Sequence, residues 1–77
     1  MTTRQITVTR DWQQLTDGTK DEVIQFYGEI AVCNSPTKPA PDAPSLRFNN
    51  QTLTITRDDI AWVRTASFYD SIILVIW

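Results

Sequence analysis

The last seven residues of this chain, 71–77, constrain its fold more than any other segment. They read Ser-Ile-Ile-Leu-Val-Ile-Trp, with six consecutive apolar side chains and no charge, glycine or proline. Alternate side chains of a β-strand point to opposite faces. One face would carry Ile72, Leu74 and Ile76, and the other Ile73, Val75 and Trp77. Left uncovered, such a strand is an aggregation hazard, so we expect both faces to be covered, the second by another copy of the chain.

The size of the chain supports this expectation of self-association. Its 77 residues make a single domain, 1–77, and small domains usually need disulfides, a metal or subunit contacts for stability. Cys33 has no second cysteine to pair with, so we expect it to fill a small buried space in a reduced compartment. Subunit contacts remain, and the candidate interface residues are Ile73, Val75, Trp77 and Trp62.

Catalytic chemistry has little support in the sequence. The chain has no histidine, which removes the commonest metal ligand and the usual general base. The carboxylate pairs Asp21/Glu22 and Asp58/Asp59 are adjacent, so in strands their members point apart. With two glycines there is no phosphate-binding loop. We expect a protein that is not an enzyme, with no catalytic, cofactor-binding or metal-binding residues.

The charge of the chain argues against two classes of partner. Its net charge is −2, and its seven basic residues are scattered along the sequence. Nucleic-acid binding normally needs a concentrated basic surface, so we expect no nucleic-acid partner. The apolar run at 71–77 is far too short to span a bilayer, and residues 1–5 lack the apolar stretch of a signal peptide. We expect a soluble protein made in the cytoplasm, with no membrane partner.

Several segments predict strands and turns. Residues 5–10 alternate polar and apolar side chains, which indicates a half-buried strand, and Asp17-Gly18 is a turn signal. Residues 45–57 predict a hairpin, because Asn49-Asn50 tolerates the backbone of a two-residue turn and would place Leu46 opposite Leu53. Residues 60–66 and 71–77 predict a second hairpin, closed by the short connection 67–70.

Two segments leave alternatives open. Residues 19–22 have the capping-box spacing, and residues 20–32 have the apolar periodicity of a helix. They are also rich in β-branched and aromatic residues and contain Gly28, which favours two short strands meeting at that glycine. Residues 34–44 contain four prolines and predict an extended loop. This loop is either a crossover between sheets or a docking peptide for a partner.

The sequence resembles the small β-rich virion-associated proteins of tailed bacteriophages and prophages. The similarity runs through Asp11-Trp12, the segment 15–19, and the segments 23–25 and 28–32. It continues through the proline-containing loop, Leu53, Ile60-Ala61-Trp62-Val63-Arg64 and the β-branched ending. The resemblance implies a small sandwich or barrel that assembles in copies on a capsid or tail, as a decoration, fibre-base or joining piece. It carries no catalytic residues.

The fold expected is therefore all-β, a small antiparallel sandwich or barrel of about six to seven short strands. The alternative is an α+β fold with a helix near 20–32. The function expected is that of a non-catalytic phage or prophage structural protein. It would be made in the bacterial cytoplasm and assemble in the virion as a homo-oligomer and with other virion proteins. The alternative is a small monomeric binding module or an acidic inhibitor of a host protein.

Overall fold

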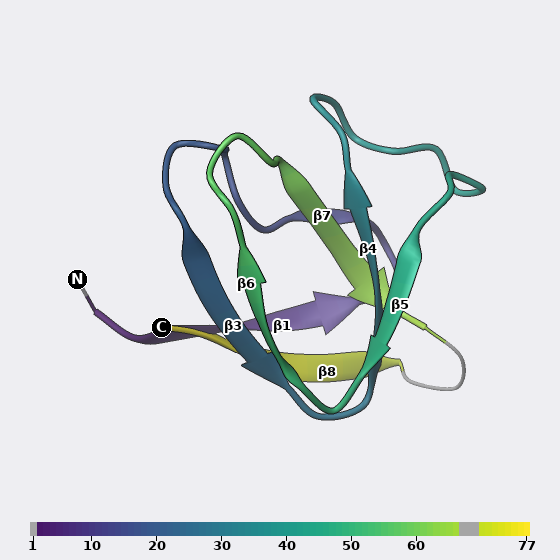
Figure 1. Ribbon diagram of the computed structural model, residues 1–77. Coiled ribbons are helices and arrows are strands. Elements are labelled where there is room, and N and C mark those ends of the chain that lie inside the picture. Colours follow the sequence, from purple (N-terminus) through teal and green to yellow (C-terminus); the bar gives the residue numbers. More distant parts are fainter. Residues whose placement is uncertain (1, 67–69) are drawn as a thin grey trace.

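The computed structural model describes residues 2–66 and 70–77, which form eight strands and no helix (Figure 1). The strands are β1 (Arg4–Thr9), β2 (Gln13–Gln14), β3 (Glu22–Phe26), β4 (Glu29–Asn34), β5 (Leu46–Asn49), β6 (Thr52–Ile55), β7 (Ala61–Thr65) and β8 (Ser71–Ile76). They form two antiparallel sheets of four strands. Sheet A has the order β1-β8-β3-β6, and sheet B has the order β2-β7-β4-β5.

The all-β sandwich expected from the sequence is confirmed, and the alternative with a helix near 20–32 is wrong. This segment forms β3 and β4, which meet at Tyr27-Gly28. The structure has one or two strands more than expected, and one of them, β2, is only two residues long. The strand expected at 5–10 is confirmed as β1.

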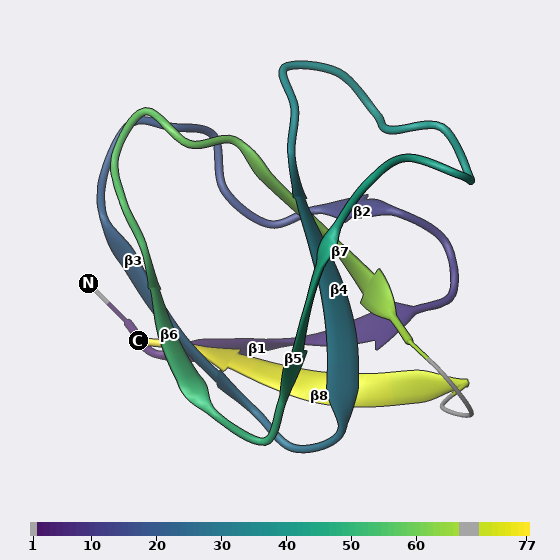
Figure 2. The ribbon, with the colours of Figure 1, turned by 45° about the vertical axis from the view of Figure 1, so that its right-hand side comes forward.

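Most consecutive strands lie in different sheets, so the chain repeatedly turns a corner between the layers. Only β4 and β5 follow one another within a sheet. The corner from β3 to β4 lies beside the corner from β5 to β6, and the backbone bond from Asn50 N–H to the Gly28 carbonyl, 3.0 Å long, joins them (Figure 2). Bent strands that pass from one layer to the other are typical of orthogonally packed sheets.

The hairpin predicted at 45–57 is wrong. Leu46 pairs with Val32 and Leu53 pairs with Ile24, so β5 and β6 pair with β4 and β3 rather than with each other. Asn50 does adopt the positive φ expected of it, at 44°. Because a tight hairpin and a sheet-changing corner can both use such a residue, the local signal could not separate them.

The hairpin predicted between 60–66 and 71–77 is also wrong. β7 pairs with β2 and β4 in sheet B, whereas β8 lies between β1 and β3 in sheet A. The connection predicted at 67–70 lies, in its residues 67–69, outside the part of the chain that is described. The two strands themselves were predicted correctly. Each of them pairs with strands that are distant in the sequence, and not with the other.

The core lies between the two sheets. The side chains that are fully buried come from both layers, among them Val8, Ile24, Phe26, Ile30, Val63 and Leu74. Gly28, at the corner from β3 to β4, has φ of 108°, a conformation that side-chain-bearing residues rarely adopt. Its N–H donates to the Asn50 Oδ1 atom at 2.5 Å, which ties the two corners together.

Candidate functional site

The outer surface of sheet A, called face A below, carries no charged side chain within its strands. The pairing register and the alternation of burial place these residues on it: Gln5, Thr7, Thr9, Val23, Gln25, Thr52, Thr54, Ser71, Ile73 and Val75. Trp77 directly follows β8, and its N–H donates to the Val23 carbonyl at 2.8 Å. Face A is thus a polar, uncharged surface with apolar side chains along β8 and β3.

The apolar residues of face A are exposed in the single chain. Trp77 is 72% exposed, Ile73 49% and Val23 36%, and Val75 is half-buried. The opposite side of β8 is fully covered, because Ile72, Leu74 and Ile76 are at most 5% exposed. The chain therefore covers the inner face of 71–77 itself, and the outer face stays exposed in the single chain.

Three of the four predicted interface residues come together on face A. Ile73 and Val75 lie on β8, and Trp77 directly follows that strand. Val23, which the sequence did not indicate, lies beside Trp77. Trp62, the fourth, lies on β7 in sheet B. Its position on the opposite layer of the sandwich separates it from the other three. Val23 could have been found only from the pairing of β3 with β8.

The outer surface of sheet B, called face B below, has a different composition. Trp62 and Arg64 of β7, Ala31 and Cys33 of β4, and Arg47 of β5 lie on it in paired rows. Cys33, expected in a small buried space, is half-exposed and lies opposite Trp62. Unlike face A, face B carries charged side chains.

The proline-rich segment expected at 34–44 forms the connection 35–45 between β4 and β5, and it is attached to face B through two tryptophans. The Trp62 indole N–H donates to the Ser35 carbonyl at 2.9 Å, and the Trp12 indole N–H donates to the Ala40 carbonyl at 3.0 Å. Trp12 is 4% exposed, and Pro39 is buried. Trp12, Trp62 and the segment therefore form a second, smaller layer of packing outside sheet B.

The sequence-based interpretation of this segment as a crossover between sheets is wrong. It joins β4 to β5, which are neighbours in sheet B. In Figures 1 and 2 it rises as a long loop from the ends of these two strands. The alternative interpretation, a docking peptide for a partner, stays a prediction, although the two indole bonds hold parts of the segment against its own sheet.

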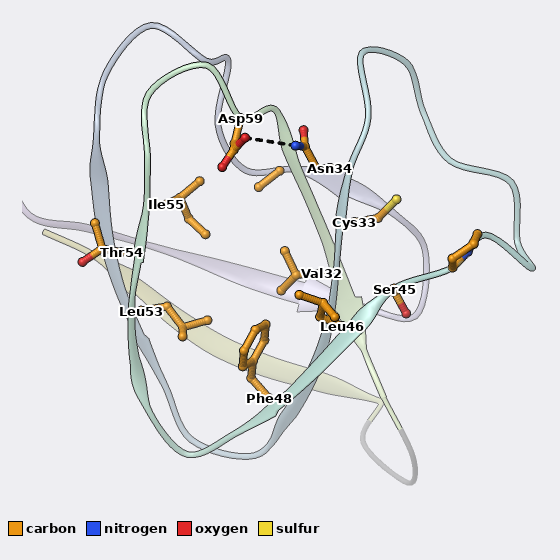
Figure 3. Close-up of a pocket in the computed structure, with 12 residues that line it drawn as sticks. Val32, Cys33, Asn34, Ser45, Leu46, Phe48, Leu53, Thr54, Ile55 and Asp59 are labelled. Atoms are coloured by element: carbon orange, nitrogen blue, oxygen red, sulfur yellow. Dashed lines mark hydrogen bonds between the residues drawn. The ribbon is translucent and has the colours of Figure 1, made fainter.

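A pocket of about 490 Å³ opens between the edge strands β5 and β6. Figure 3 shows Phe48 and Leu46 of β5 and Leu53 and Ile55 of β6 lining it, with Val32 at its base. At one end, Asp59 accepts a hydrogen bond from the Asn34 amide at 3.0 Å. The pocket exists because β5 and β6 diverge into different sheets, which the hairpin prediction did not allow.

Three of the four side chains in the acidic pairs have structural partners. Asp21 accepts from the Arg57 N–H at 2.6 Å, and Asp59 accepts from the Thr56 hydroxyl at 3.0 Å. Glu22 is buried and lies 3.5 Å from the Lys20 ammonium group. Among residues 2–66 and 70–77, no group of three or more Cys, Asp or Glu side chains is placed to hold a metal ion. In the same residues, no helix has the length and apolar character needed to cross a membrane.

Neither the fold nor these surfaces can be assigned by similarity. Comparison of the chain with protein-family models, with curated proteins and with solved structures finds no match. The function must therefore be inferred from the surfaces themselves, and face A is the candidate functional site.

Proposed function

We propose that this protein is a non-catalytic structural protein that assembles with copies of itself through face A. The observation that carries the proposal is the exposure of Ile73 and Trp77 on a sheet surface without charge. A second copy is the occupant favoured, because two uncharged faces meet without like-charge repulsion and without burying an unpaired ion. Homo-oligomer interfaces are typically more apolar than the remaining surface.

The size of face A indicates how strong this association is. A strand of six residues is about 20 Å long, and four strands spaced about 4.8 Å apart span roughly 15–20 Å. The face therefore covers about 300–400 Å², whereas a standard interface buries about 800 Å² per partner. We expect association that weakens on dilution unless contacts beyond face A contribute.

The place of assembly in this proposal is a bacteriophage or prophage virion. Its support is the sequence resemblance to small β-rich virion-associated proteins, together with an all-β sandwich of the size that the resemblance implies. On this proposal the protein is made in the bacterial cytoplasm, and its partners are its own copies and other virion proteins.

Light scattering on a sizing column over a dilution series tests the proposal. The expected result is a discrete multiple of 8.8 kDa at high concentration. Val75→Asp should reduce the mass to that of one chain, because it places a charge in the centre of the interface. Ala40→Asp, which adds the same charge to an exposed position of the proline-rich segment, is the matched control. A single-chain mass at every concentration, or equal effects of both variants, would contradict self-association.

A second function is favoured by the pocket between β5 and β6, namely that of a monomeric binding module. Each of these strands pairs on only one side, and apolar side chains lie between them. An extended apolar peptide could pair with a free strand edge and place alternate side chains in the pocket. Leu46→Asp, at a residue that is 67% exposed, should abolish such binding without unfolding the chain. Nuclear magnetic resonance shifts of Leu53 and Ile55 on adding apolar peptides would detect it.

A further inference from the structure

Three arginines that are far apart in the sequence line one hollow beside face B. Arg10, Arg47 and Arg64 surround a space of about 220 Å³, together with Ala31 and Ser45. Arg47 is paired with Ala31, and Ala31 is paired with Arg64, so the two arginines flank a small residue in one row of the sheet. Because the side chain between them is a single methyl group, space remains over it. The scattered positions of these arginines gave no sequence signal for this arrangement.

Two of these arginines have no ion-pair partner among the described carboxylates. Neither the Arg47 nor the Arg64 guanidinium forms an ion pair within residues 2–66 and 70–77. Arg10 pairs with Asp70 at 2.9 Å, but the two side chains are 63% and 91% exposed. Exposed pairs of this kind contribute little to stability, so a ligand can compete for Arg10. Glu29 lies two residues before Ala31, has an interaction of its own and does not line the hollow.

The Arg64 guanidinium is held in position by Trp12. Its central carbon lies 4.3 Å from the centre of the indole ring, which is a cation–π arrangement. Trp12 is itself buried and anchored by its bond to the Ala40 carbonyl. A guanidinium restrained in this way loses less conformational entropy when it binds an anion. The hollow thus has one preorganised arginine and two arginines whose side chains are exposed.

We propose that this hollow binds the dianionic phosphate group of a phosphomonoester or of inorganic phosphate. Guanidinium groups match phosphate oxygens with paired N–H donors. A phosphomonoester carries a charge of about −1.5 to −2 at neutral pH, which matches the charge of the two arginines that have no ion-pair partner. A phosphodiester group of a nucleic acid carries a single negative charge and matches them less well. The volume is too small for a whole drug-sized ligand, whose sites span about 300–1,000 Å³, so only the phosphate end would enter.

The test is a titration of the full chain followed by the nuclear magnetic resonance signals of the arginine side-chain N–H groups. Glycerol phosphate and inorganic phosphate are each added against sodium chloride at matched ionic strength. The expected result is a saturable shift of Arg10, Arg47 and Arg64 with both phosphates, and only a small, non-saturating change with chloride. With glycerol phosphate, binding should weaken as the pH falls below about 6, because the ester then loses its second charge while the arginines stay protonated.

Arg47→Gln should weaken binding at least about tenfold, since it removes a charge-assisted contact. Arg57→Gln, which removes an arginine outside the hollow, is the control and should leave affinity within about twofold. Retained backbone dispersion in both spectra shows that the variants are folded. Equal shifts with phosphate and chloride, or equal losses in the two variants, would overturn the proposal. Tighter binding of a short thymidine oligonucleotide than of glycerol phosphate would overturn the assignment to a monoester.

Discussion

The two outer faces of this sandwich both carry tryptophan, but the tryptophans differ in exposure. On face B, Trp12 is buried and Trp62 is half-buried, and both indoles donate to carbonyls of the proline-rich segment. On face A, Trp77 is 72% exposed, and its backbone N–H donates to the Val23 carbonyl. One face is covered by its own chain, and the other is not.

In this protein a structural tryptophan differs from a candidate interface tryptophan in whether its own chain covers it, because the residue type is the same. Face B has charged side chains and a segment of its own chain lying on it, whereas the side chains that sheet A presents on face A are uncharged. Exposed apolar surface on an ordered sheet is the usual mark of an interaction site. If the covered face is the structural one, its tryptophans should contribute more to the stability of the single chain than Trp77 does.

The largest effect expected is on Trp12. Trp12→Ala removes a buried aromatic side chain and should lower the free energy of unfolding by about 3–5 kcal/mol. Trp77→Ala removes an exposed one and should change the stability of the single chain by about 0.5 kcal/mol or less. Urea denaturation followed by circular dichroism, at a concentration where the chain is monomeric, measures both. Equal losses would mean that the two faces do not differ in energy.

A smaller effect is expected at Trp62. Trp62→Phe keeps the aromatic ring but removes the bond to the Ser35 carbonyl, which should cost about 0.5–1.5 kcal/mol. The same substitution at Trp77 removes no hydrogen bond of the kind found for Trp62 and serves as the control. Urea denaturation gives the free energies, and amide hydrogen exchange should become faster in residues 35–45 of the Trp62 variant alone. Unchanged exchange there would argue that the indole bond does not hold the segment.

Salt should separate the two faces further. The exposed ion pair between Lys38 and Asp11, 3.0 Å long, joins the proline-rich segment to the connection after β1. Lys38→Ala should cost less than about 1 kcal/mol at low salt, and the loss should vanish near 1 M salt, where charges are screened within about 3 Å. Self-association through the uncharged face A should not weaken over the same range. Association that falls steeply with salt would point to charged contacts outside face A.

The smallest effect expected lies in the turn between β2 and β3, which belongs to neither face. The Thr19 hydroxyl and then its N–H donate to Asp17 Oδ1, and these bonds hold the Asp17 pKa below its usual 3.8. The stabilisation from this depressed pKa is present above pH 3.8 and is lost as the pH falls through the folded-state value. Thr19→Val should raise the Asp17 pKa towards 3.8, as measured by carboxyl carbon shifts during an acid titration. An unchanged pKa would show that the hydroxyl does not set it.

Much of the local structure could be predicted from the sequence. The strands at 5–10, 60–66 and 71–77, the two short strands that meet at Gly28 and the positive φ of Asn50 follow from alternation and turn chemistry. The split of 71–77 into a buried and an exposed set also follows from alternation. Three of the four candidate interface residues were brought to one surface for the same reason.

The pairing partners could not be predicted in this way. Residues 46–49 and 52–55 have the pattern of a hairpin, yet they pair with 29–32 and 22–25. The chain turns a corner between them, so that β5 completes sheet B and β6 completes sheet A. The place of Val23 beside Trp77 depends on the pairing of β3 with β8, and Leu46 and the arginine hollow depend on the pairing of β4 with its neighbours. The position of Trp62 on the layer opposite Trp77 depends on the pairing of β7 with β2 and β4.

Alternation and turn preference act over a few residues, so they specify which segments are strands and which sides of those strands are apolar. Which strands pair, which apolar side remains uncovered and which charges meet are set by the fold. Those outcomes depend on hydrogen bonds and burial between segments that are tens of residues apart, and no short pattern encodes them. The candidate interface on 71–77 could therefore be predicted from the sequence, whereas the arginine hollow could be found only in the fold.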